Sequence, residues 1–190
     1  FSLMNISMRG QFSAHITTSI FAGFIVSFPY ILWELWRFIS PALLAGETKL
    51  AKGIVFFSSL LFMSGIVFGY YVVAPLSVNF LGSYQVSSTV ANQIGLTSFI
   101  STVTTVCMAN AIIFELPILV YFLTKIGLLT PNFMRIYRKH AMVVTLILSA
   151  IITPPDISSQ VLVSLPLIVL YELSIRISAR VIINQEKNKS

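Results

Sequence analysis

Residues 98–124 read SFISTVTTVCMANAIIFELPILVYFLT, and this stretch decides the fold class. At about 1.5 Å of rise per residue, an α-helix over these residues is long enough to cross the roughly 30 Å hydrocarbon core of a bilayer. Glu115 carries the only formal charge in the stretch. We therefore expect a membrane-spanning helix here.

Further apolar segments lie on both sides of it, at residues 16–38, 53–81, 141–152 and 157–170. Over the whole chain, 56% of the residues are hydrophobic and 9% are charged, whereas a soluble domain carries about 25% charged residues. The sequence predicts an all-α integral membrane protein, a polytopic helix bundle that forms a single transmembrane domain over residues 1–190. The last two segments are short, since residues 141–153 rise only roughly 20 Å as a helix. A re-entrant hairpin and two true crossings both stay open for them, and true crossings require a locally thinner bilayer.

The basic residues indicate how the segments are oriented. When successive apolar segments cross the membrane in opposite directions, every lysine and arginine except Arg9 falls on one side of the membrane. By the positive-inside rule that side is cytoplasmic. An extracytoplasmic start and a cytoplasmic end require an odd number of crossings, and five fit the segments. Residues 179–190 are predicted to be a cytoplasmic tail.

Most other classes of function lack a signature in this sequence. The net charge of +6 does not indicate nucleic acid, because the basic residues interrupt apolar segments and form no single patch. His15 and His140 have no metal-ligand spacing, and Cys107 is the only cysteine, so neither a metal site nor a disulfide within the chain is expected. No phosphate-binding loop or nucleophile elbow appears. We expect no catalytic residue, no cofactor and no enzyme, although the sequence does not exclude a Ser/Lys dyad.

Glu115 is the most informative single residue. An acidic side chain in the middle of a bilayer costs at least about 2.5–3.5 kcal/mol on insertion scales. Pro117 donates no backbone N–H and frees the carbonyl of Ile113, so the helix should be kinked beside the carboxyl group. A structural hydrogen bond to another helix is one interpretation. A polar spot presented to a substrate or partner is the interpretation that we favour.

Three other features carry weaker signals. Ser40 and Pro41 start a predicted short helix that ends near Gly46, which leaves Glu47 in a loop where a solvated ion pair is the commonest role. The G-x-x-x-G pattern at residues 65–69 predicts a close helix-packing seam. Thr153 and Gln160 flank a Pro-Pro turn, where they can hydrogen-bond an incoming helix, or Gln160 can cap its own helix.

At these residues the chain resembles the TatC family, the multi-spanning receptor subunits of the twin-arginine protein translocase. The resemblance runs through essentially the whole chain, in order. Its motifs are FPYIL at 28–32, WRFISPAL at 36–43, Glu47, GYYVVAPL at 69–76, FELP at 114–117, TP at 130–131, TPPD at 153–156 with Gln160, and LYEL at 170–173.

The resemblance implies a fold of six transmembrane helices with both termini cytoplasmic, of which this chain has the last five, with the two short segments as true crossings. It implies that Glu47, supported by Phe38 and Pro41, binds the paired arginines of a signal peptide, since a carboxylate can accept a guanidinium bidentately. Glu115 is then the intramembrane polar site on a concave surface. Thr153 and Gln160 are then where single-span TatA and TatB subunits dock.

The family also exports folded proteins with the proton-motive force, works with other copies of itself, and is found most often in the bacterial inner membrane. The chain opens with Phe1, and we expect that the family's first helix and the cytoplasmic segment before it, with a second arginine-binding glutamate, precede it. A different class of function, a proton-coupled small-solute transporter that uses Glu115, is the alternative. A membrane scaffold without a transport role is a third reading.

Overall fold

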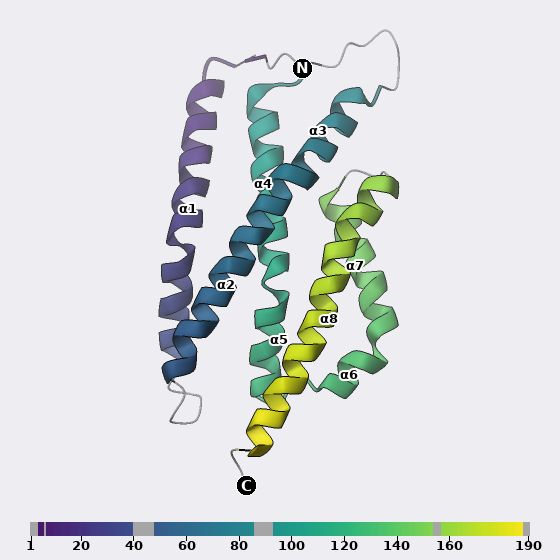
Figure 1. Ribbon diagram of the computed structural model, residues 1–190. Helices are drawn as coiled ribbons and strands as arrows, with labels where there is room; N and C mark the ends of the chain where they lie inside the picture. Colours follow the sequence, from purple (N-terminus) through teal and green to yellow (C-terminus); the bar gives the residue numbers. More distant parts are fainter. Residues whose placement is uncertain (1–3, 6, 40–47, 86–92, 154–156, 188–190) are drawn as a thin grey trace. The chain divides into compact units, whose positions relative to one another are not determined.

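The computed structural model describes residues 4–5, 7–39, 48–85, 93–153 and 157–187. These residues are almost entirely helical, and the order of elements along the chain is shown in Figure 1. The elements are α1 (Gly10–Ile39), α2 (Thr48–Phe68), the π-helical turn η2 (Gly69–Val73), α3 (Ala74–Ser83), α4 (Leu96–Phe114), α5 (Leu116–Lys125), α6 (Pro131–Ile136), α7 (Arg138–Ile152) and α8 (Ile157–Lys187). The chain divides into two units, Phe1–Ala111 and Ile112–Ser190, which are described separately.

Four stretches in the described residues are long and apolar enough to cross a membrane: Gly10–Phe38, Gly53–Ser83, Leu96–Lys125 and Ser159–Glu186. They confirm the predicted class, an all-α polytopic membrane protein. The 15 residues of α7 rise only about 22 Å, so this helix is short, as expected.

The last helix is longer than the sequence suggested. Charged residues such as Glu172, Arg176 and Arg180 interrupt the apolar run after Leu170, but α8 continues without interruption to Lys187 over 31 residues. The physical reason is that Glu, Arg and Lys are good helix formers, so a charged segment ends a hydrophobic run without ending the helix. The helix therefore includes most of the predicted tail at 179–190.

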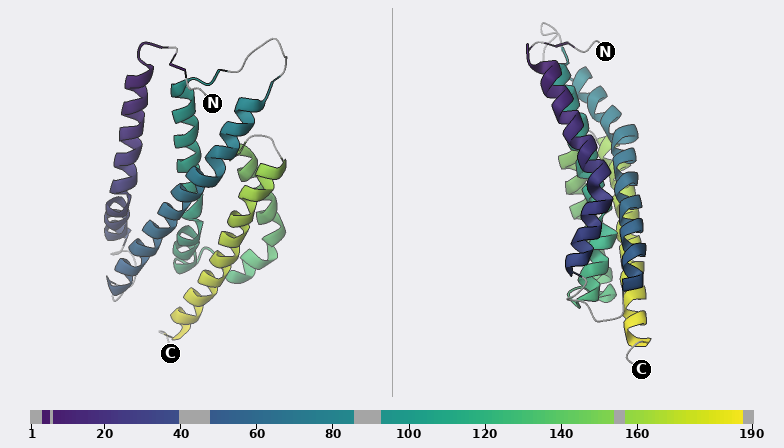
Figure 2. Two further views of the ribbon diagram at one scale, coloured as in Figure 1. Left: turned by 45° about the horizontal axis from the view of Figure 1, so that its top comes forward. Right: turned by 90° about the vertical axis from the view of Figure 1, so that its left-hand side faces the viewer.

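In the first unit, α2, η2 and α3 form one continuous helical segment, visible in all views of Figures 1 and 2. Pro75 lies in the first turn of α3 and has no N–H to donate, which explains why the backbone widens into a π-helical turn just before it. The rings of Phe28 and Phe62 stack with centroids 3.5 Å apart and join α1 to α2.

A seam of very close backbone contact, which we call the α2–α4 seam, joins the end of α2 and the first residue of η2 to α4, at the predicted G-x-x-x-G pattern. A Cβ atom on Gly65 would lie 2.7 Å from Ala111 Cα, and one on Gly69 would lie 2.8 Å from Cys107 Cα. No side chain larger than hydrogen fits at these distances without moving the backbone. The predicted packing seam is confirmed.

In the second unit, α8 is the central element, and α5, α6 and α7 all pack against it. Its buried positions recur at intervals of three and four residues, which is the spacing of one helix face. They are Ser159, Val163, Leu167, Leu170, Ser174, Ser178 and Val181, and Ser164 and Ile175 beside this row are buried as well. Small serines in this face let the helices approach closely, and the Thr124 hydroxyl donates to Ser178 Oγ at 2.9 Å across the α5–α8 contact.

Candidate functional site

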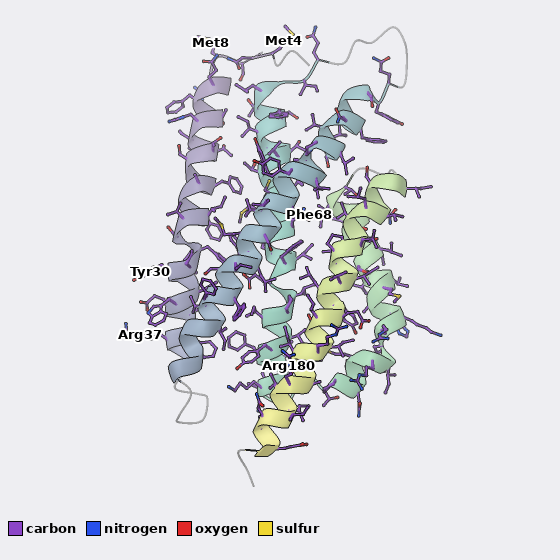
Figure 3. The ribbon with its side chains drawn as sticks, viewed as in Figure 1. Met4, Met8, Tyr30, Arg37, Phe68 and Arg180 are labelled. Carbon is purple, nitrogen blue, oxygen red and sulfur yellow. The ribbon has the colours of Figure 1, made fainter. Side chains whose placement is uncertain are left out.

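The first candidate site lies at the end of α1. Phe38 is in the last turn of this helix, and its side chain is 84% exposed. Arg37, beside it, lies 3.9 Å from Glu34 in an exposed ion pair, and Figure 3 shows Arg37 at this end of α1. Pro41 and Glu47, together with the predicted short helix between them, lie outside the described residues. Of the three residues of the predicted binding site, the structure therefore describes only Phe38, and its ring is exposed.

Glu115 lies at an interruption between two helices, as its sequence context predicts. Helix α4 ends at Phe114 and α5 begins at Leu116. The Glu115 carbonyl accepts hydrogen bonds from the N–H groups of Ile118 and Leu119, both at 3.0 Å. Pro117 follows, fully buried, in the first turn of α5. The predicted break beside the carboxyl group is therefore confirmed, and the side chain itself is partly buried.

Thr153 and Gln160 belong to one hairpin, formed by α7 and α8. Thr153 caps the end of α7, is only 4% exposed, and donates its hydroxyl hydrogen to the Ser149 carbonyl at 2.6 Å. Gln160 Nε2 donates to the Leu146 carbonyl at 3.1 Å. This bond crosses from α8 to α7, so Gln160 uses its amide on a neighbouring helix and not, as one of the two alternatives had it, as a cap of its own helix. The reason is that the hairpin brings a carbonyl of α7 within reach of the first turn of α8.

The described residues contain a further polar link that the sequence did not indicate. Arg138 Nη2 donates to Glu172 Oε2 at 2.9 Å, and Arg138 Nε lies 2.8 Å from Glu172 Oε1, which makes a bidentate ion pair between α7 and α8. The Tyr171 hydroxyl donates to the Met134 carbonyl at 2.8 Å and joins α8 to α6. Tyr171 and Glu172 lie in the LYEL motif, and that motif was the only available signal.

Several of these groups form hydrogen bonds or an ion pair between helices. Among the described residues, no group of three or more histidine, cysteine, aspartate or glutamate side chains lies together as a metal site would require. Cys107 is buried in the α2–α4 seam. Apart from Phe38, the described candidate residues are polar side chains on an apolar helical framework.

The family model and two similar curated relatives carry the same description. The family model described as Sec-independent protein translocase protein (TatC) matches residues 1–166. A protein of that name from Blattabacterium sp. subsp. Periplaneta americana is 42% identical over 176 residues, covering 93% of this chain and 66% of the relative. One from Helicobacter pylori strain J99 is 42% identical over 166 residues, covering 87% of this chain and 66% of the relative.

Solved structures that resemble this chain are also of TatC proteins. A crystal structure described as the twin arginine translocase receptor TatC in DDM is 38% identical, covers 92% of this chain and 77% of that chain, and has a TM-score of 0.74. A second structure of such a receptor gives 36% identity and a TM-score of 0.73. The chain spans just under two thirds of the length of the two curated relatives described above.

Proposed function

This chain belongs to the TatC family, and from that premise we propose that it serves as the multi-spanning receptor subunit of a twin-arginine translocase, exporting folded proteins at the expense of the proton-motive force. The observation that carries the proposal is the family match over residues 1–166, which runs from α1 into α8. The protein is a multi-pass membrane protein. We place it in the bacterial inner membrane with its C-terminus in the cytoplasm, since all its basic residues except Arg9 then lie inside.

The proposed signal-peptide site combines Glu47 with Phe38 and Pro41. A carboxylate in the loop after α1 accepts an arginine guanidinium through two parallel hydrogen bonds, which a lysine ammonium cannot reproduce. The exposed ring of Phe38 offers a face over which a second cation can lie. A paired-arginine motif fits these two groups better than a single arginine does.

The test replaces Glu47 with alanine in the full-length protein and measures export of a twin-arginine reporter. We expect export to be lost while the protein stays in the membrane at its normal level. The matched control is Glu186→Gln, which removes one exposed negative charge from α8 and should leave export unchanged. Normal export by the Glu47→Ala variant would refute Glu47 as an arginine ligand.

We propose that the outer end of the α7–α8 hairpin, at Thr153 and Gln160, is where single-span TatA and TatB type subunits dock. The Thr153 hydroxyl and the Gln160 amide hydrogen-bond to α7. Their contribution is therefore to hold the hairpin in shape, and exposed apolar neighbours such as Val161 supply the contact area. Val161 is 51% exposed, and Ile183, near the other end of the same helix, is 52% exposed.

Disulfide trapping tests this docking face. In a Cys107→Ala background, Val161→Cys should cross-link to a cysteine in the transmembrane helix of TatA or TatB, and Ile183→Cys should not. Because the two positions are equally exposed, a difference reports the partner's location and not general reactivity. Cross-linking at Ile183→Cys alone would place the partner elsewhere.

The competing function is a proton-coupled small-solute transporter, and the observation that favours it is the carboxyl group of Glu115 at an interruption between membrane helices. It predicts solute uptake by purified protein in liposomes, with loss of uptake in the Glu115→Gln variant. As a receptor subunit, the purified protein alone should transport no small solute. Uptake that depends on Glu115 would overturn the receptor proposal.

A further inference from the structure

The segment between α5 and α7 forms a defined corner in the second unit, which we call the α6 corner (residues 126–140). Helix α5 ends in a Schellman motif, in which Gly127 has a φ of 81° and its N–H bonds the Thr124 carbonyl at 3.0 Å, while the Leu128 N–H bonds the Leu123 carbonyl at 2.9 Å. Thr130 is the N-cap of α6, and its hydroxyl oxygen accepts a hydrogen bond from the Phe133 N–H at 3.2 Å. The corner is therefore held by its own hydrogen bonds.

The α6 corner has a buried side and an exposed apolar side. Met134 is 4% exposed and packs with Val120 and Ile175 in the core of the second unit. The exposed side carries large apolar side chains, and two of their rings, Phe133 and Tyr137, lie 4.5 Å apart. The exposed members are Leu128, Phe133, Ile136 and Tyr137. Such a surface is unfavourable in water and needs an apolar partner.

The corner also lies where the bilayer should end. The candidate span that contains α5 stops at Lys125, so the residues that follow are at the boundary between acyl chains and headgroups. Aromatic side chains are enriched at this depth in membrane proteins. An apolar side there has acyl chains as its immediate neighbours.

Two cations at the corner have no counter-ion in the part of the chain that the structure describes. Arg135 and Lys139 are exposed, and within the described residues neither makes an ion pair. Arg138, between them in sequence, is paired with Glu172, so that carboxylate is already used. A ligand with an anionic phosphate at one end and an acyl chain at the other would match both the two cations and the exposed apolar side of the corner.

We propose that the α6 corner is a binding site for an anionic phospholipid, with the headgroup phosphate at Arg135 and Lys139 and an acyl chain against Phe133, Ile136 and Leu128. Arginine and lysine both bind phosphate well, and arginine can do so through two hydrogen bonds. Each basic residue near an anionic membrane surface strengthens binding by about fivefold. The site needs no other subunit, and it is independent of the signal-peptide site proposed at Glu47.

The experiment places the intact protein in nanodiscs and uses quenching by lipids with brominated acyl chains. Phe133→Trp introduces a reporter at the corner, and the signal of the parent protein, which has Trp33 and Trp36, is subtracted. At equal mole fraction, brominated phosphatidylglycerol should quench the introduced tryptophan more strongly than brominated phosphatidylcholine. Combining Arg135→Gln with Lys139→Gln should remove that preference, and each single change should lower it about fivefold.

Two controls keep the test decisive. Arg9→Gln removes an exposed basic residue on the predicted opposite side of the membrane and should leave the preference intact. Combining Arg135→Lys with Lys139→Arg keeps both charges and should retain it, which separates loss of charge from a folding defect. Equal quenching by the two lipids would overturn the proposal, and so would the absence of quenching by either, because the corner would then be covered by protein.

Discussion

Replacing Gly69 with alanine should open the seam between α2 and α4. The added Cβ would lie 2.8 Å from Cys107 Cα, whereas carbon atoms in contact are ordinarily about 3.5–4.0 Å apart. The two backbones must therefore separate by about 1 Å. Inserting a methyl group into a packed core costs about 1–3 kcal/mol, which corresponds to an increase of about 5- to 160-fold in the equilibrium constant for opening.

Cys107 provides the assay for this change. It is the only cysteine in the chain, and it is buried at the seam, so a thiol-reactive dye labels it only when the seam opens. In detergent micelles under native conditions, the labelling rate of the Gly69→Ala variant should rise by the same factor as the opening equilibrium. Gly65→Ala, whose Cβ would lie 2.7 Å from Ala111 Cα, should act in the same direction.

The matched control is Gly23→Ala, which makes the same chemical change on α1 at a position where nothing lies within 4 Å of the added Cβ. Alanine favours helix over glycine by up to about 1 kcal/mol, so this variant should label no faster than the parent. Labelling of Gly69→Ala within twofold of the parent would refute the steric reasoning. Equal acceleration by Gly23→Ala would do so as well, since it would show that glycine itself and not the close approach matters.

Three interactions in the second unit can be tested by measuring unfolding of variants in mixed micelles. Arg138→Gln and Glu172→Gln should each destabilise the second unit. In a double-mutant cycle their coupling energy should be about 0.5–1 kcal/mol, because the ion pair is bidentate but about 40% exposed. A coupling energy of zero would show that the ion pair does not contribute to stability. Thr124→Val should cost about 1 kcal/mol, since it leaves the buried Ser178 hydroxyl without its donor. Combining it with Ser178→Ala should recover part of that loss, and no recovery would contradict a direct hydroxyl contact. Tyr171→Phe should cost about 1 kcal/mol through loss of the bond to the backbone of α6; an unchanged unfolding midpoint would refute this.

The features that the sequence predicted correctly depend on the chemistry of neighbouring residues. Apolar runs predict helices in lipid, and the helices were found. Pro117 lacks an N–H, so the interruption beside Glu115 follows from two adjacent positions. Gly65 and Gly69 are one helical turn apart and therefore share a face, which makes a packing seam predictable without knowing which helix fills it.

The polar links of the second unit were decided by packing alone. Arg138 and Glu172 are 34 residues apart, and Gln160 is 14 residues from the Leu146 carbonyl that it binds. No local pattern specifies such pairs, because they depend on the rotation and tilt of α7 against α8. The extent of α8 was missed for another reason, because charged residues such as Arg176 and Arg180 interrupt the apolar run without ending the helix.

The amino-acid sequence alone thus determined that the chain lies in lipid, that it is helical, and which family it belongs to, because each of these follows from apolar runs and short motifs. Only the tertiary structure decided that the Thr153 hydroxyl and the Gln160 amide both bond to α7, and that the α6 corner turns its aromatic side outward. Those outcomes depend on which helix faces are covered, and coverage is set by contacts between segments that are far apart in sequence.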